Sequence, residues 1–276
     1  MSRLGGKPRK DVGIARQALN YLKRGLGSYL KEGKHEFEEW QKRNPSKSFK
    51  DFFSETVEAK LRSGEVHKSL GGTFTDKKYG EVGQGFFRKI VKLGLNPDDV
   101  LVDYGCGTLR MGIHAINYLE PGKYWGLEIS DFLLQQGREL VGEALLVEKQ
   151  THLEVISPAS VAAAAAVKPA MLISIRVLIH VHPDELEEYF ANVMTIIGSS
   201  GQAVINGKWS EHGTIQSSNR SWAHDVSTLE RIVNAQGGAM RILTQEGCEL
   251  EGINERAMSG TFRIASDHAP PQHRSN

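Results

Sequence analysis

A glycine turn between an apolar run and an amphipathic segment constrains the fold of this chain more than any other feature. Residues 100–112 read VLVDYGCGTLRMG. The apolar start predicts a buried strand, and the residues after Arg110 suit a helix. Gly105 and Gly107 tolerate positive φ and leave the backbone open to close approach by a ligand. Because N–H groups at a helix start favour a polar or anionic ligand group, the sequence predicts a strand, a ligand-binding turn and a helix here.

The spacing around this turn separates three ligand classes that use such geometry. A dinucleotide fingerprint is G-x-G-x-x-G, but Arg110 stands at the third glycine position. A P-loop needs lysine and a hydroxyl residue after its last glycine, and Ile113 and His114 stand there instead. The third class binds S-adenosylmethionine (SAM) and places an acidic residue two positions before the glycines, where this chain has Asp103.

The glycine turn and the end of the next expected strand, taken together, resemble those of class I SAM-dependent methyltransferases. The resemblance implies SAM as the cofactor, with contacts from Asp103, Tyr104, Gly105, Cys106 and Gly107. Glu128 ends the next expected strand, and in the family an acid at this place accepts hydrogen bonds from both ribose hydroxyls, as a carboxylate can. Ile129 follows it as a further cofactor neighbour. The two acids and the missing third glycine favour SAM over a nicotinamide dinucleotide.

Apolar runs alternate with amphipathic segments from residue 85 onward, which predicts a parallel sheet with right-handed crossovers. The expected strands are 100–103, 124–129, 153–156, 171–175 and 202–205. The expected helices are 86–93, 110–119, 130–140, 158–166, 184–197 and 226–235. Two further strands, 240–244 and 259–265, would be antiparallel at the edge. The resemblance implies an α/β, Rossmann-like, seven-stranded, mostly parallel sheet with helices on both faces.

Composition changes along the chain predict four regions. Residues 1–10 form a basic disordered tail, 11–68 a helical N-terminal extension, 69–266 the methyltransferase domain and 267–276 a disordered tail. The extension is interpreted as a lid or substrate-recognition element, with plain helix packing or an oligomer contact as the alternative.

Further cofactor contacts are implied by position in the family fold. In the glycine-rich segment before the first core helix, the resemblance points to Tyr79, with Thr73, Phe74 and Gln84 as weaker candidates. After the third expected strand, Ser157 would accept a bond from the adenine amine, or else cap the following helix. At the end of the fourth strand, the cofactor contacts would come from Ser174 and Arg176.

Histidines supply the candidate catalytic bases. His180 lies in a Val-Leu-x-His stretch typical of the family, and a histidine near neutral pKa is the usual base for a hydroxyl nucleophile. Packing on the cofactor side is the competing role. His224 and His212 are the other candidates for the base. His180 and His182 form a His-x-His pair without a third ligand, so we expect no metal.

The segment after the fifth expected strand, residues 206–225, combines aromatic, amide and charged side chains. In this fold it would overlie the ligand-binding edge of the sheet, which suits a sugar or another polyhydroxylated acceptor, unless it is an ordinary polar loop. The segment GCGTLRMG…YLEPGKYWGLE resembles the corresponding segment of bacterial methyltransferases that modify polysaccharides or glycolipids. We therefore expect O-methylation of a small molecule: a sugar, a glycolipid or another natural product.

Two other functions remain open from the sequence. RNA or protein methylation is disfavoured, since the base-amine motif Asn/Asp/Ser-Pro-Pro-Tyr/Phe is absent and the net charge is only +1. A non-catalytic SAM-binding regulator would carry the same cofactor motif.

Composition also bears on compartment and partners. The chain has two cysteines, no apolar run of membrane-spanning length and no signal-peptide pattern. We expect a cytoplasmic protein with a small-molecule partner, and a homo-oligomer is compatible with the sequence.

Overall fold

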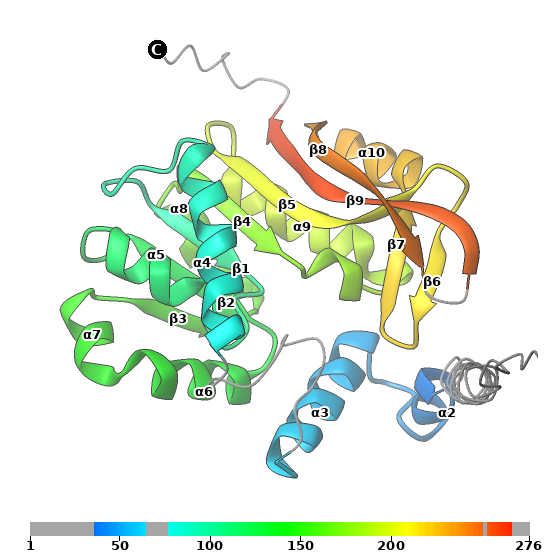
Figure 1. Ribbon diagram of the computed structural model, residues 1–276, viewed down its shortest axis with the longest axis horizontal. Helices are drawn as coiled ribbons and strands as arrows, with labels where there is room; N and C mark the ends of the chain where they lie inside the picture. The colour runs from blue at the N-terminus through cyan, green and yellow to red at the C-terminus, as the bar shows by residue number, and fades with distance from the viewer. Residues whose placement is uncertain (1–35, 65–76, 251–252, 267–276) are drawn as a thin grey trace, which may run out of the picture.

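The computed structural model describes residues 36–64, 77–250 and 253–266. A single twisted sheet of nine strands forms the centre of this part of the chain (Figure 1). The two predicted tails, 1–10 and 267–276, lie outside the described residues. The described part of the predicted extension contains α2 (Glu36–Arg43) and α3 (Phe49–Arg62).

Five parallel strands build the core of the sheet in the order β3-β2-β1-β4-β5. They are β1 (Leu101–Tyr104), β2 (Tyr124–Glu128), β3 (His152–Val155), β4 (Met171–Ile175) and β5 (Gln202–Ser210). Every residue of β1 and β2 is buried, as expected for parallel strands covered on both faces, which read as continuous apolar runs.

The antiparallel part of the sheet follows β5. β9 (Ile253–Ser266) pairs antiparallel with β5, and β8 (Gly238–Leu250) pairs antiparallel with β9. These seven strands confirm the predicted Rossmann-like sheet. Both late strands are longer than the sequence predicted, because their polar residues are held by ladder hydrogen bonds rather than by alternating apolar contacts.

A hairpin within residues 206–225 differs from the predicted polar segment. β5 continues to Ser210, and β6 (Ile215–Ser218) pairs antiparallel with β7 (Ser221–Asp225). Trp209 of β5 pairs with Met258 of β9 and with His224 of β7. β7 therefore lies on the side of β5 that faces β4, beyond the end of β4.

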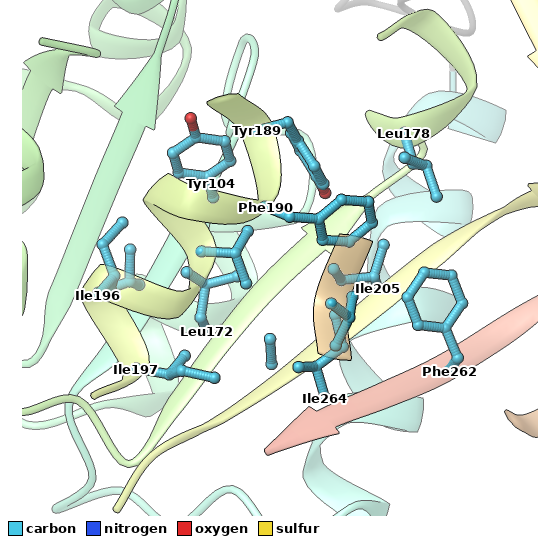
Figure 2. Packing of buried hydrophobic residues seen from close by; sticks show 14 of the residues in the cluster. Tyr104, Leu172, Leu178, Tyr189, Phe190, Ile196, Ile197, Ile205, Phe262 and Ile264 are labelled. Carbon is cyan, nitrogen blue, oxygen red and sulfur yellow. The ribbon is translucent and has the colours of Figure 1, made fainter. Parts of the chain in front are cut away.

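Helices cover both faces of the sheet. α8 (Pro158–Ala166), α9 (Leu186–Ile197) and α10 (Val226–Ala235) pack on one face, where residues of α9 meet β4, β5 and β9 (Figure 2). α4 (Lys77–Lys92), α5 (Gly112–Tyr118), α6 (Asp131–Val141) and α7 (Glu143–Glu148) cover the other face. α4 begins earlier than predicted, and α5 begins at Gly112 because residues 105–111 turn before becoming helical.

The extension packs where the parallel strands end. Ser48 caps α3 in a capping box with Asp51. Aromatic rings from both helices form a cluster with Trp222 of β7, consisting of Phe37, Trp40, Phe49, Phe52 and Phe53. This contact places α3 across the carboxyl ends of the strands (Figure 1).

Candidate functional site

A cavity of about 190 Å³ opens at the carboxyl ends of β1, β2 and β4. In open α/β sheets, ligands bind outside these ends. The predicted cofactor residues that line it are Asp103, Tyr104, Gly105, Cys106, Gly107, Glu128, Ile129 and Arg176. The structure thus brings together most of the set that the sequence singled out.

The glycine turn forms the floor of this cavity. The N–H groups of Gly105 and Cys106 both donate to the carbonyl of Leu127, at 2.7 and 3.0 Å. Gly105 has φ +81° and Gly107 has φ +57°. A Cβ on Gly105 would lie 2.4 Å from Cγ2 of Val177, whereas a Cβ on Gly107 would meet nothing within 4 Å. The first glycine is required by packing, and the second leaves backbone open to a ligand.

We expect Gly105→Ala to lower the free energy of unfolding by about 2–4 kcal/mol, because a left-handed φ and a clash with Val177 combine. Gly107→Ala should cost only about 1–2 kcal/mol, from its φ alone. Urea unfolding measures both, and adding Val177→Ala to Gly105→Ala should restore part of the loss. Equal losses in the two single variants would contradict this distinction.

Asp103 is a buried carboxylate at the end of β1, with 3% of its surface exposed. Its Oδ2 accepts a hydrogen bond from the Tyr124 hydroxyl at 2.8 Å. Burial raises the pKa of Asp103 to about 7, the Tyr124 bond lowers it, and the charge of Glu128 raises it further. A ligand cation in the cavity would favour the ionised form of this carboxylate.

Glu128 is the second buried carboxylate, with 6% of its surface exposed. Its Oε2 accepts from the N–H of Gly107 at 2.8 Å, and its Oε1 accepts from its neighbour Ile129 at 2.9 Å. Burial raises the pKa of Glu128, and these backbone bonds oppose the shift. Within the described part of the chain, neither Glu128 nor Asp103 forms an ion pair. The cavity is therefore built to receive positive charge.

Two predicted cofactor residues, Ser157 and Ser174, are not among those that line the cavity. Ser157 accepts from the Ser160 N–H at 3.1 Å and caps α8, which was its alternative role. Ser174 is buried, donates to the Tyr104 carbonyl at 2.9 Å and accepts from the Tyr189 hydroxyl at 2.8 Å. The side chain of Tyr79 lies outside the described residues, as do Thr73 and Phe74.

The wall beyond β3 is apolar. Ile156 and Leu133 line the cavity there, and Ser157 is occupied by its capping bonds. No carboxylate among the described lining residues stands at this wall. A planar apolar group would fit such a wall, while any polar contact with it would have to come from the backbone.

His180 lies at the cavity with one ring nitrogen already bound. Its Nδ1 is 2.6 Å from the carbonyl oxygen of Arg220 and 3.2 Å from Oγ of Ser221. A carbonyl oxygen can only accept, so Nδ1 carries the proton and Nε2 keeps a free lone pair. The pKa of His180 is lowered to about 4, mainly by burial; the bond to the Arg220 carbonyl opposes this shift, and the charges of Arg176, Arg220 and Lys208 add to it. The ring is therefore neutral at physiological pH.

His224 and His212 occupy different surroundings from His180. His224 is fully buried, and its Nε2 donates to the Leu178 carbonyl at 3.0 Å. Burial lowers the pKa of His224 to about 4. His212 is exposed in the loop after β5. Neither ring lines the cavity, so His180 is the one of the three candidate histidines that does.

The extension supplies cavity residues that the sequence did not reveal. Lys50 and Phe53 of α3 line the cavity beside Glu185 and Glu188. The Lys50 N–H donates to Oε1 of Glu185 at 3.0 Å, and its Nζ lies 2.7 Å from Oε1 of Glu188. Nothing in a single sequence marks a pair 138 residues apart.

α3 spans the cavity mouth between two parts of the sheet. At its N-terminal end it contacts His180 through Phe53, with ring centroids 5.0 Å apart. At its C-terminal end the Arg62 guanidinium lies 4.5 Å from the ring of Phe132 in α6. The predicted extension is thus a wall of the cavity.

The aromatic residues of segment 206–225 are used for packing. Trp209 and Trp222 are buried, at 2% and 5% exposure. Arg220 binds Glu36, and Asp225 caps α10 through the N–H of Thr228. None of the described residues 206–225 lines the cavity, so the rings predicted to stack on a sugar do not face it.

The described residues contain neither a cluster of metal ligands nor a helix suited to cross a membrane. No group of three or more His, Cys, Asp or Glu side chains there could hold a metal ion. No helix in the same part of the chain combines the length and apolar character needed to cross a bilayer.

Strand order, the antiparallel β9 and the cavity at the strand ends define a Rossmann-like methyltransferase fold. No protein-family model matches the chain. Among solved structures, it is similar to magnesium protoporphyrin IX methyltransferase from Synechocystis PCC 6803 with bound SAM. The TM-score is 0.52 and the identity 15%, over 80% of this chain and 99% of that one.

A second solved structure is similar over the same share of this chain. Phosphoethanolamine N-methyltransferase 2 from Haemonchus contortus, bound to phosphomonomethylethanolamine and S-adenosylhomocysteine, aligns with a TM-score of 0.54 and 13% identity. The alignment covers 80% of this chain and 61% of that one. At these identities the similarity concerns the fold, which is that of class I SAM-dependent methyltransferases.

Proposed function

We propose that the protein binds SAM and transfers its methyl group to a small-molecule acceptor. The observation that carries this proposal is the pair of buried carboxylates, Asp103 and Glu128, which face one cavity and form no ion pair with a described residue. Unpaired buried charges are costly unless a ligand compensates them. A ligand with positive charge and hydroxyl groups meets both needs, and SAM has both.

The residues present fit that cofactor. Glu128 keeps acceptor capacity for ribose hydroxyls, since a carboxylate has about four lone-pair sites and its described bonds come from backbone N–H groups. Asp103 would face the cationic amino acid part. Gly107 has open space above it, and Ile156 with Leu133 gives an apolar wall for a purine. When bound, SAM supplies a methyl group already activated by its sulfonium charge.

His180 is the residue that would take the acceptor proton. Its Nδ1 proton is held by the Arg220 carbonyl, so Nε2 is the free basic atom of the ring. A neutral ring is ready to accept a proton from a hydroxyl as the new bond to carbon forms. Methyl transfer is an in-line displacement in which positioning contributes most. This arrangement favours O-methylation.

The acceptor is proposed to be a small molecule with a hydroxyl group. The cavity walls around His180 combine the ring of Phe53 with the charged groups Lys50, Glu185 and Glu188. Trp209 and Trp222 are buried and cannot stack on a sugar. A sugar or glycolipid acceptor is therefore proposed only from the resemblance of the turn segment. RNA or protein methylation and a non-catalytic SAM-binding regulator are the alternatives.

Calorimetric titration of the full chain tests the cofactor. SAM should bind in the micromolar range, about −8 kcal/mol, and NAD should give no heat of binding. A panel of phenols, hydroxy acids and free sugars with radiolabelled SAM then tests transfer. Binding of NAD instead of SAM would refute the proposal, and SAM binding without transfer to any class of acceptor would favour the regulator.

His180→Gln should reduce turnover about 10²–10⁴-fold, with the dissociation constant for SAM changed less than about twofold. Because the pKa of His180 is lowered to about 4, wild-type turnover should stay level as pH falls from 8 to 5 and decline only near pH 4. Exposed His212→Gln is the matched control and should retain wild-type turnover. Unchanged turnover in His180→Gln would exclude this base.

A further inference from the structure

The main-chain carbonyl that orients His180 belongs to a short turn. Residues 219–220 connect β6 to β7, and the carbonyl of Arg220 accepts the Nδ1 proton at 2.6 Å. The group that binds the distal nitrogen of a histidine fixes its tautomer and its orientation. The turn therefore occupies the place that a carboxylate takes beside many catalytic histidines.

This turn is held by the extension as well as by its own hairpin. Both oxygens of Glu36 in α2 lie 3.0 Å from Nη2 of Arg220, and the Asn219 amide is 3.4 Å from Oε2 of Glu36. The guanidinium also lies 5.3 Å from the ring of Phe52. The Arg220 side chain is only 14% exposed, so solvent screens this pair less than an ordinary surface ion pair.

The extension also reaches His180 from a second direction. The Phe53 ring packs on the imidazole at 5.0 Å, and Phe49 packs edge-on against Trp222 of β7 at 4.8 Å. The ring of His180 is thus enclosed between α3 and the 219–220 turn. Both parts of this enclosure depend on the extension keeping its position.

We infer that Glu36 and Arg220 are positioning residues that hold His180 as the Nδ1–H tautomer, with Nε2 free for the acceptor proton. This inference deepens the proposed function and rests on it. Neither side chain touches the reacting atoms. Their ion pair fixes the backbone carbonyl that fixes the base.

Nitrogen-15 spectra of the histidine rings in the full-length protein test this directly, because no acceptor is needed. His180 is assigned by the loss of its signals in His180→Gln. In wild type, we expect the Nδ1–H tautomer and a neutral ring down to about pH 4, matching its lowered pKa. In Arg220→Met and Glu36→Gln, both tautomers should be populated, because the carbonyl of residue 220 is no longer held in place to accept the Nδ1 proton.

Two further variants separate positioning from general destabilisation. Glu55→Gln breaks the Lys47–Glu55 ion pair beside α3 and should leave the His180 spectrum as in wild type. Arg220→Lys keeps a charged donor and should restore part of the wild-type tautomer ratio. Wild-type spectra in both Arg220→Met and Glu36→Gln would overturn the inference, as would an Nε2–H tautomer in the wild type. Titration of the same samples with SAM judges the proposed function separately.

Discussion

Glu128→Gln is expected to weaken SAM binding by at least about 100-fold. The change removes the charge and one acceptor oxygen from a buried site, and a hydrogen bond to a charged group contributes about 1.5–3 kcal/mol. Two such bonds to ribose hydroxyls would be affected together. The Gly107 N–H can still donate to the remaining amide oxygen, so the turn itself should keep its shape. Calorimetry with SAM, at equal fractions of folded protein, measures the loss.

Glu154→Gln is the matched control for this variant. Glu154 lies on the neighbouring strand, in register with Leu127, and its side chain is exposed. We expect its affinity for SAM to stay within about twofold of the wild type. If Glu128→Gln bound SAM with wild-type affinity, Glu128 would not be a cofactor-binding residue. The proposal drawn from the two buried carboxylates would then lose its support.

Asp103→Asn is expected to have opposite effects on binding and on stability. The pKa of Asp103 is raised to about 7 in the folded protein from an ordinary value of 3.8. Between these values the folded protein keeps a proton that the unfolded chain has lost, so its stability falls as pH rises. At pH 8 this pKa shift corresponds to a loss of up to about 4 kcal/mol in the free energy of unfolding. Asp103→Asn should recover part of this free energy of unfolding, and it should also lose measurable SAM binding.

Thermal or urea unfolding of the ligand-free protein at pH 4 and pH 8 tests whether its stability falls as pH rises. The gain from Asp103→Asn should be present at pH 8 and fall to a small fraction near pH 4, where the unfolded chain also begins to bind the proton. Exposed Asp98→Asn should show no such dependence. A loss of stability at pH 8 in Asp103→Asn would mean that its carboxylate is compensated within the folded protein.

Much of the cofactor side could be predicted from the sequence because its signals are local. Asp103, the glycine turn and Glu128 lie within one strand–turn–helix–strand unit, where periodicity and glycine conformation determine the geometry. The same local logic predicted Ser157 as a helix cap in one of its two roles. The alternation of strands and helices predicted the parallel part of the sheet, and the family resemblance implied its seven strands.

The acceptor side could not be predicted in the same way, because it is made by contacts between distant segments. Lys50 meets Glu188 across 138 residues, and no pattern near either residue indicates the pair. The β6–β7 hairpin was missed because residues 206–225 are rich in polar groups, and such a segment reads as a loop. Its strands are stabilised by pairing with β5 and by buried Trp222, which local composition does not reveal.

The contact between Glu36 and Arg220 also bears on the order in which the protein folds. The two residues are separated by 184 positions, so the pair closes a loop that contains the five parallel core strands β1 to β5. Contacts of such sequence separation form after the local ones that shorten the effective loop. The parallel strands and the cofactor turn can therefore assemble first. In refolding experiments, recovery of SAM binding should precede the burial of His180.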